Sequence, residues 1–198
     1  MTNHAGWEHL FQSGDFPPRY QQLAAPNESV SAWADTLPIG AVVLDLGCGV
    51  GRHTVYLGIR GFRMAGLDIS PTGVAQTQVA CAERGISFDG HTGDMTRLPW
   101  GDDTFDAVLS TSTVCHHRMA DIQKTLAEVW RVLKPGSLFL VDFLHKGTLS
   151  YREVVAGTLT EIEPNTFIDD SADPDLHDDA FIPHHFCDEA EVRDLLRA

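Results

Sequence analysis

The sequence has few basic residues, and only three of its 14 lysines and arginines are lysines. Against 28 aspartates and glutamates, this leaves a formal net charge of −14. Nucleic-acid binding draws much of its free energy from Lys and Arg side chains that displace counterions from phosphates. We therefore expect no nucleic-acid partner. The acidity itself is explained equally well by solubility or by a salt-rich habitat.

Long apolar runs and a secretion signal are also missing. No stretch approaches the ~20 consecutive apolar residues of a membrane helix. The first ten residues include Asn3, His4 and Glu8, where a secretion signal would be basic and then apolar. The sequence therefore predicts a cytoplasmic protein with no membrane partner.

The four cysteines form no Cys-x-x-Cys pair, so neither a structural zinc site nor a dense disulfide framework is indicated. Two His-His doublets, at 116–117 and 184–185, do not change this expectation, because adjacent residues of a strand point to opposite faces. We expect reduced thiols and no metal. The cysteines are Cys48, Cys81, Cys115 and Cys187.

The most informative stretch is residues 42–54, Val-Val-Leu-Asp-Leu-Gly-Cys-Gly-Val-Gly-Arg-His-Thr. Its branched apolar start is typical of a buried parallel strand. Gly47, Gly49 and Gly51 permit positive φ and let a ligand approach the backbone. A helix that begins near Gly51 would present its first N–H groups to that ligand. This pattern favours a nucleotide-type cofactor site over a merely flexible loop.

The remaining chain continues to alternate strands with helices, and 198 residues with 43% hydrophobic content suit one compact domain. This predicts an α/β, Rossmann-like fold: a doubly wound, mostly parallel sheet with right-handed crossovers and helices on both faces. We expect further strands near 62–67, 86–91, 105–110 and 138–143, and helices near 55–60, 71–84 and 121–133.

The two ends of the chain are less regular. Residues 1–40 are rich in aromatic side chains and predict an N-terminal helical cap, with a helix near 29–37, on a cofactor-binding domain at 41–198. Within that domain, residues 158–186 are compatible with a hairpin insertion over the substrate site. Asp188 and Glu191 form a capping box for a last helix.

Two acids end predicted strands. Asp68 stands where a carboxylate accepts hydrogen bonds from ribose hydroxyls, and Asp94 follows the third strand, within reach of an adenine ring. Each acid alone is explained as well by a surface position, but together with the glycine loop they describe an adenosine groove. A dinucleotide fingerprint would need glycine at position 52, which is Arg52, so an NAD(P)-dependent oxidoreductase is a distant third hypothesis.

Four motifs carry a family resemblance: Asp-Leu-Gly-Cys-Gly-Val-Gly, Gly-Leu-Asp-Ile-Ser, Gly-Asp-Met, and the stretch Glu-Val-Trp-Arg-Val-Leu-Lys-Pro-Gly. Over residues 42–143, with a weaker echo at 185–196, the chain resembles the class I S-adenosylmethionine-dependent methyltransferases. The similarity is closest to their small-molecule (type 11/25-like) branch.

The resemblance implies that S-adenosylmethionine lies across the carboxyl ends of the strands and leaves as S-adenosylhomocysteine. The glycine loop would face its methionine part, Asp68 would hold the ribose, and residues after the third and fourth strands would contact the adenine and the amino group. Arg52 and His53 would either reach the carboxylate or serve in packing. The implied cofactor-binding residues are Asp45, Gly47, Cys48, Gly49, Asp68, Ile69, Asp94, Met95, Ser110 and Thr111.

The implied reaction is in-line transfer of a methyl group from a sulfonium to a small-molecule acceptor. Because the leaving group is excellent, positioning alone supplies much of the acceleration, on the order of 7 to 11 kcal/mol. A general base is needed only for some acceptors. The candidates are His117 and His116, then His145, His184 and His185. No motif fixes the acceptor.

One departure from the family concerns the end of the sheet. The family's sheet has two more strands after the fifth, whereas this chain stops after the helix that should precede them. An exposed fifth strand is a liability unless covered. We expect a shortened or altered terminus, with cover from residues 158–186 or from a partner chain as the alternative. The protein would thus be a monomer or a homodimer. A catalytically silent S-adenosylmethionine-binding subunit is the competing hypothesis for function.

Overall fold

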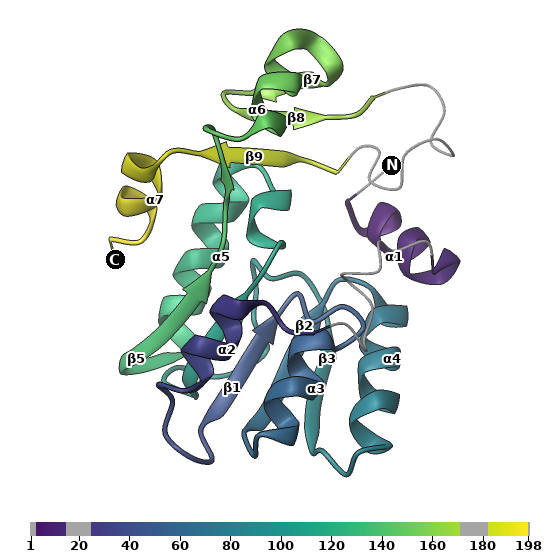
Figure 1. Cartoon of the computed structure of the whole chain (residues 1–198), viewed down its shortest axis with the longest axis vertical. Helices are drawn as coiled ribbons and strands as arrows, with labels where there is room; N and C mark the ends of the chain where they lie inside the picture. Colours follow the sequence, from purple (N-terminus) through teal and green to yellow (C-terminus); the bar gives the residue numbers. More distant parts are fainter. Residues whose placement is uncertain (1–2, 15–24, 171–181, 198) are drawn as a thin grey trace.

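The computed structural model describes residues 3–14, 25–170 and 182–197. Its centre is a five-stranded parallel sheet in the order β3–β2–β1–β4–β5 (Figure 1). The chain therefore has the predicted α/β fold with a mostly parallel sheet. The five strands are β1 (Val42–Leu46), β2 (Arg63–Asp68), β3 (Phe88–Thr92), β4 (Phe105–Ser110) and β5 (Leu133–Val141).

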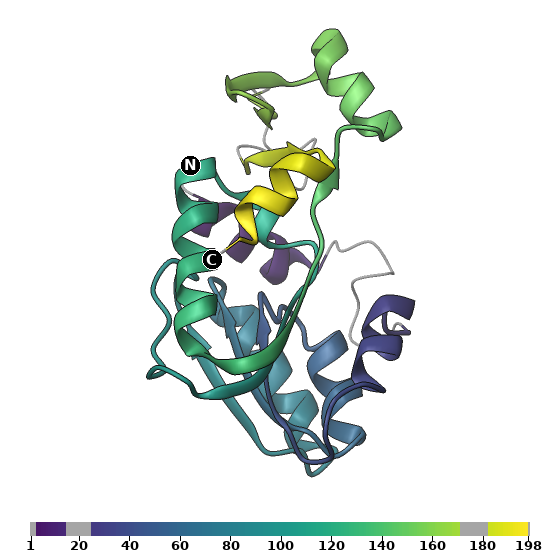
Figure 2. The same cartoon turned by 90° about the vertical axis from the view of Figure 1, so that its left-hand side faces the viewer.

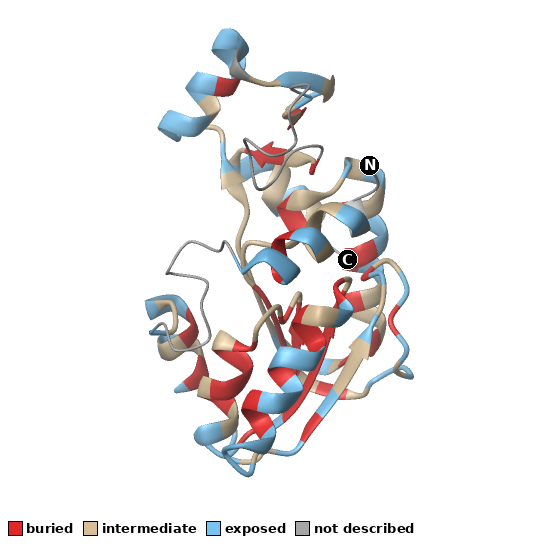
Figure 3. Ribbon diagram, turned by 90° about the vertical axis from the view of Figure 1, so that its right-hand side faces the viewer, coloured by how far each residue is buried: buried red, intermediate tan, exposed pale blue. Residues whose placement is uncertain are grey.

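Alternate side chains of the strands enter two separate cores, one on each face of the sheet. Val43 packs in the core under α2 (Glu28–Ala34), α3 (Arg52–Ile59) and α4 (Pro71–Ala82). The next residue, Leu44, packs in the core under α5 (Met119–Val132). Figure 3 shows most of the buried residues in this layered half of the molecule.

The connection between β3 and β4, residues 93–104, contains turns and no helix. Arg131 of α5 holds this connection from the side. Its guanidinium donates to the carbonyl oxygens of Trp100 at 2.9 Å and Leu98 at 3.2 Å, and pairs with Asp102 at 3.0 Å. A side-chain anchor thus takes the place of a crossover helix.

β5 also begins five residues earlier than the sequence predicts. Leu133 already pairs with Phe105, and the register shifts before Leu138 pairs with Ala107. Gly136 adopts φ +79° in this irregular stretch, so the Pro-Gly pair that signals a turn is absorbed within the strand. Lys134 fixes the strand against β4 through a 2.6 Å contact with Asp106.

A second, four-stranded sheet follows β5, in the order β6–β9–β8–β7. Thr160–Glu163 and Thr166–Ile168 form a tight hairpin of their own, with Asn165 at φ +61° in the turn. β9 then pairs antiparallel with β8 and parallel with β6. The predicted single hairpin between 158–168 and 180–186 is thus three strands. The strands are β6 (Leu144–His145), β7 (Thr160–Glu163), β8 (Thr166–Ile168) and β9 (His184–Cys187).

Three helices complete the described chain. α6 (Leu149–Glu153) continues into the π-helical turn η3 (Val154–Thr158) beside the second sheet, and α1 (Asn3–Ser13) lies beyond the ends of the central strands. α7 (Glu189–Leu195) lies below β9, alongside α5 (Figure 2). Leu195 and Leu196 at its end pack against the core under α5. Within the described ranges, no helix is long and apolar enough to cross a membrane.

Candidate cofactor and acceptor site

The glycine loop joins β1 to α3 and packs closely against two other segments. Gly47 has φ +82°, and a Cβ there would lie 2.3 Å from Thr113 Cγ2. Gly49 has φ +51°, and a Cβ there would lie 3.2 Å from the Phe11 ring of α1. The loop therefore requires glycine both for its backbone conformation and for this close approach.

Asp68 lies at the carboxyl end of β2, beside the loop. Its Oδ2 accepts from Gly49 N at 2.8 Å and its Oδ1 from Ser70 N at 2.9 Å. The side chain is 7% exposed, and burial raises its pKa to about 6. A carboxylate has about four acceptor positions, and the backbone N–H groups of Gly49, Ser70 and Ile69 use up to three of them. The remaining acceptor capacity fits a ribose hydroxyl, which would donate to it.

Asp45 is buried one strand away, at the end of β1. Its Oδ2 accepts from the Thr54 hydroxyl of α3 at 2.6 Å. Burial raises its pKa to about 6, and the nearby Asp68 acts in the same direction. Two buried acids thus lie near each other at the carboxyl ends of β1 and β2. Such a pair favours a cationic or hydrogen-bond-donating ligand.

Cys48 within the loop is a packing residue. It is buried in the core under α3 and α4, and burial raises the pKa of its thiol well above the ordinary value. A protonated, buried thiol is a poor nucleophile. The side chain of Cys48 thus packs into the core below the loop.

The end of β3 carries the residues expected near the adenine. Gly93 N donates to Asp68 O at 2.9 Å, which brings this turn beside β2. Asp94 is exposed, and its Oδ1 accepts from the backbone N and the hydroxyl of Thr96, both at 2.8 Å. Met95 is buried, whereas Ile69 after β2 is half-buried. The turns after β2 and β3 thus lie side by side at the carboxyl edge of the sheet.

At the end of β4, the side chains make internal contacts. The buried hydroxyl of Ser110 donates to Leu46 O at 2.9 Å, and Thr111 Oγ1 lies 3.1 Å from His53 Nδ1. His53 Nε2 accepts from Asn27 N at 3.3 Å, and the guanidinium of Arg52 donates to Asn27 Oδ1 at 3.1 Å. Burial and the neighbouring Arg52 lower the pKa of His53 to about 3. His53 is thus a neutral link between β4 and the segment before α2.

The two histidines after β4 face different neighbours. His116, at the end of η2 (Val114–His116), stacks edge-on against Trp7 of α1 at 5.2 Å and His184 of β9 at 4.7 Å between ring centroids. His117 is half-buried, and burial lowers its pKa although Asp94 and Asp121 act in the opposite direction. His116 therefore faces α1 and β9, while His117 lies near enough to Asp94, in the turn after β3, for that carboxylate to affect its pKa.

His145 and His185 lie elsewhere. His145 Nδ1 accepts from Gly147 N at 2.9 Å within a turn after β6. His185 is buried between Thr166 and Glu191. Neither ring joins the group formed by His116, His184 and Trp7, and both are less suited than His116 to act on a bound substrate.

Sequence reasoning does not find Glu8, which ties α1 to the start of α4. Its carboxylate accepts from Thr72 Oγ1 at 2.6 Å, from Thr72 N at 3.3 Å and from the Ser70 hydroxyl. These hydrogen bonds lower the pKa of Glu8 to about 2. An acid on a short amphipathic helix carries no signal for this contact, because its partners are 62 and 64 residues away.

Asp142, directly after β5, is a second residue that the sequence does not single out. Its Oδ1 accepts from Ser112 N at 2.5 Å, and burial raises its pKa. Ser112 has φ +52°, a conformation that favours glycine or asparagine. The contact holds the segment that carries Thr113 against the glycine loop.

Comparison with known proteins agrees with this geometry. A family described as a methyltransferase domain matches residues 43–136. An uncharacterised methyltransferase of Synechocystis sp. is 33% identical over 132 residues, which cover 65% of this chain and 55% of the relative. A 2-methyl-6-phytyl-1,4-hydroquinone methyltransferase of the same organism is 34% identical over 140 residues, 67% of this chain and 43% of the relative.

The fold is found among solved structures as well. A methyltransferase dependent on S-adenosylmethionine from Methanosarcina mazei superposes with a TM-score of 0.71 at 22% identity, over 87% of this chain and 83% of that one. The chain spans about half the length of the curated relatives, or less. The loop, the strand order and these matches identify the chain as carrying a class I S-adenosylmethionine-dependent methyltransferase domain, a family whose cofactor is S-adenosylmethionine.

Proposed function

We propose that this chain transfers a methyl group from S-adenosylmethionine to a small-molecule acceptor. The observation that carries the proposal is Asp68, whose two oxygens are oriented by Gly49 N and Ser70 N at the carboxyl edge of the sheet. These contacts fix a buried carboxylate with acceptor capacity left beside a glycine loop. A ribose hydroxyl matches that arrangement.

In this proposal, the other edge residues hold the rest of the cofactor. The backbone at Gly47 and Gly49 approaches its methionine part, and the buried Asp45 lies near the amino group. Asp94 accepts from the adenine amino group through Oδ2, because its Oδ1 is engaged by Thr96. The remaining contacts to the adenine and the amino group come from Ile69, Met95, Ser110 and Thr111, with Cys48 as packing beneath the loop.

The acceptor side is proposed at the aromatic group formed by Trp7, His116 and His184. Thr113, three residues before His116, lies against Gly47, and Phe11, one helical turn after Trp7, lies against Gly49. The aromatic group thus stands next to both glycines. Its rings suit an acceptor with a planar or apolar body, and its imidazoles suit one with an ionisable hydroxyl or amine.

This arrangement would accelerate the reaction mainly by holding the two reactants in position. When bound, the cofactor supplies an activated methyl group on a sulfonium centre. The loop and Asp68 would hold the cofactor, and the aromatic group would orient the acceptor toward the methyl group. For a hydroxyl acceptor, His116 takes the proton that the acceptor loses. We propose His116 rather than His117 for this role because of its contacts with α1 and β9.

Calorimetry with S-adenosylhomocysteine tests the cofactor half of the proposal. Asp68→Ala is expected to weaken binding by more than tenfold, because a hydrogen bond from the ribose to the carboxylate is lost. Asp35→Ala is the matched control, since that exposed acid follows α2 and forms an ion pair with Arg60. Failure of the wild-type chain to bind S-adenosylhomocysteine would refute the proposal, and binding of NADH instead would favour an oxidoreductase.

Turnover of a panel of phenolic, amine and carboxylate acceptors tests the second half. His116→Ala should lower turnover of hydroxyl acceptors while leaving the affinity for S-adenosylhomocysteine within about twofold, a factor that corresponds to less than 1 kcal/mol. His117→Ala serves as the comparison. Cofactor binding without turnover of any acceptor would instead favour the silent binding subunit.

A further inference from the structure

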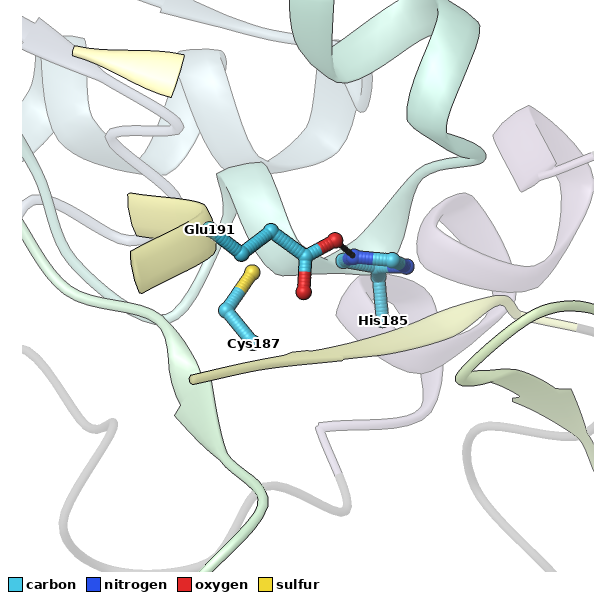
Figure 4. Close-up of side chains that lie close together, drawn as sticks. All are labelled: His185, Cys187 and Glu191. Carbon is cyan, nitrogen blue, oxygen red and sulfur yellow. Dashed lines mark hydrogen bonds and ion pairs between the residues drawn. The ribbon is translucent and has the colours of Figure 1, made fainter. Parts of the chain in front are cut away.

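A second polar cluster lies where β9 leads into α7, apart from the glycine loop. His185 and Cys187 are two residues apart on β9, so their side chains share one face of the strand. Glu191 comes from the first turn of α7. The ligand atoms of the three side chains all lie within 4.8 Å of one another (Figure 4). His185 is 1% exposed and Cys187 is fully buried.

The hydrogen bonds around His185 leave one of its ring nitrogens facing an acid. Thr166 Oγ1 lies 2.7 Å from His185 Nδ1 and 3.2 Å from Glu163 Oε1, so its hydroxyl can donate to the acid while its oxygen accepts from the ring. The other ring nitrogen, Nε2, lies 3.1 Å from Glu191 Oε1. This pair is bridged either by a hydrogen on Nε2, which a neutral ring can carry, or by a metal ion bound to both atoms.

We propose that His185, Cys187 and Glu191 bind a zinc ion. An imidazole nitrogen, a thiolate sulfur and a carboxylate oxygen form the mixed ligand set typical of Zn²⁺. Ligand atoms around tetrahedral zinc are separated by roughly 3.3 to 3.8 Å, given bond lengths of about 2.0 to 2.3 Å. The atoms of the cluster lie within 4.8 Å of one another, so side-chain rotations that close a gap of at most about 1.5 Å would bring them to the ion. A water molecule would complete the fourth position.

The surroundings of the cluster support this assignment. Metal-binding histidines are usually oriented by a hydrogen bond from the second ring nitrogen, the part that Thr166 plays here. Lys146 binds the other oxygen of Glu191 at 2.9 Å and Asp188 at 3.2 Å, which leaves Glu191 Oε1 directed at the histidine. Once Cys187 is ionised, its thiolate and the carboxylates of Glu191 and Asp188 carry three negative charges. Lys146 supplies one positive charge.

Binding is balanced by the loss of one proton. The zinc–sulfur bond forms as the S–H bond of Cys187 breaks, and that proton passes to the buffer; a proton on His185 Nε2, if present, leaves with it. The ion would join β9 to α7. It would thereby fix the strand whose preceding residue, His184, stacks on His116.

Cobalt titration of chelator-treated protein tests the proposal, because Co²⁺ bound to a thiolate gives an intense charge-transfer absorption. We expect one ion per chain, this absorption, and displacement of cobalt by zinc. Cys187→Ser should remove the absorption and weaken zinc binding by more than tenfold. Cys81→Ser is the matched control, since Cys81 is an equally buried thiol in the core under α3 and α4.

Two further measurements test zinc binding even if the Cys187→Ser variant fails to fold. Wild-type protein should release at least one proton per zinc bound, which calorimetry in two buffers of different ionisation enthalpy reports, whatever the fate of the variants. Thr166→Val should weaken zinc binding about 10-fold or more through the orientation of His185. Absence of metal binding, cobalt binding without the thiolate absorption, or equal affinity in Cys187→Ser would overturn the proposal and leave a proton between His185 and Glu191.

Discussion

The two sheets of this protein hold their polar residues in place by different means. At the edge of the five-stranded sheet, Asp68 is oriented by backbone N–H groups from the adjoining loops. In the four-stranded sheet, His185 is held by the side chains of Thr166 and Glu191, which come from other elements. The first site depends on local backbone conformation, whereas the second depends on side chains brought together from distant positions.

The cores beneath the two sheets also differ, in the number of buried residues that they contain. The five-stranded sheet separates two large clusters of buried residues, one on each face. Among the described residues, the cluster that supports the four-stranded sheet has three buried members, Val154, Phe167 and Phe186, with a few partly buried side chains packed against them. A small core gives a region little free energy of its own, so local unfolding of the second sheet should be easier than unfolding of the first.

The largest expected effect comes from removing one aromatic ring from each core. Phe167→Ala and Phe105→Ala each delete a buried ring, at a cost of about 3 to 5 kcal/mol. We expect Phe167→Ala to expose the amides of β7, β8 and β9 to hydrogen exchange while S-adenosylhomocysteine still binds. Phe105→Ala should lower the free energy of unfolding of the whole chain. Equal loss of protection in both sheets with Phe167→Ala would show that they unfold as one unit.

A smaller effect distinguishes backbone conformation from side-chain contact at the first site. Gly47→Ala should lower the free energy of unfolding by about 2 to 3 kcal/mol, from left-handed strain and the clash with Thr113, and weaken binding of S-adenosylhomocysteine by more than tenfold. Gly61 also has positive φ, but has nothing within 4 Å of a Cβ. Gly61→Ala should therefore cost only about 1 kcal/mol, with binding unchanged. Urea unfolding and calorimetry measure both.

The smallest expected effect concerns the buried acid Asp45. Its pKa rises from 3.8 to about 6 on folding, so the folded chain binds more protons between these values than the unfolded chain. This contribution to stability is complete below the lower value and is lost as the pH rises through about 6. In Asp45→Asn, the decline in the free energy of unfolding between about pH 4 and about pH 7 should be smaller by at most about 3 kcal/mol, the free energy that corresponds to a rise of about two pKa units. An unchanged decline in urea unfolding would show that Asp45 does not titrate in this range.

Sequence reasoning predicts the parallel sheet well because its signals are local. A run of branched residues, three glycines and an acid at the next strand end lie within 27 residues of one another, from 42 to 68. Ser70 and Pro71 likewise predict the start of α4, where Ser70 Oγ accepts from Gly73 N at 3.0 Å. An error arises at β5, where the Pro-Gly pair before position 137 lies within the strand although the sequence indicates a turn there.

The parts of the site that sequence reasoning does not find are contacts between distant residues. Glu8 reaches Ser70 and Thr72, and Asp142 reaches Ser112, 30 residues away. His116 and His184 meet although 68 residues separate them. No periodicity or spacing reports such pairs, because the residues between them do not specify how the segments pack.

By itself, the sequence determined the strand, glycine loop and acids of a class I methyltransferase domain, since backbone geometry ties their function to their order along the chain. Only the tertiary structure decided that α1 closes on that loop and that His116 faces α1 and β9. It also decided that His185, Cys187 and Glu191 converge. The physical reason is that packing of the second sheet and of α1 places side chains that share no local backbone constraint.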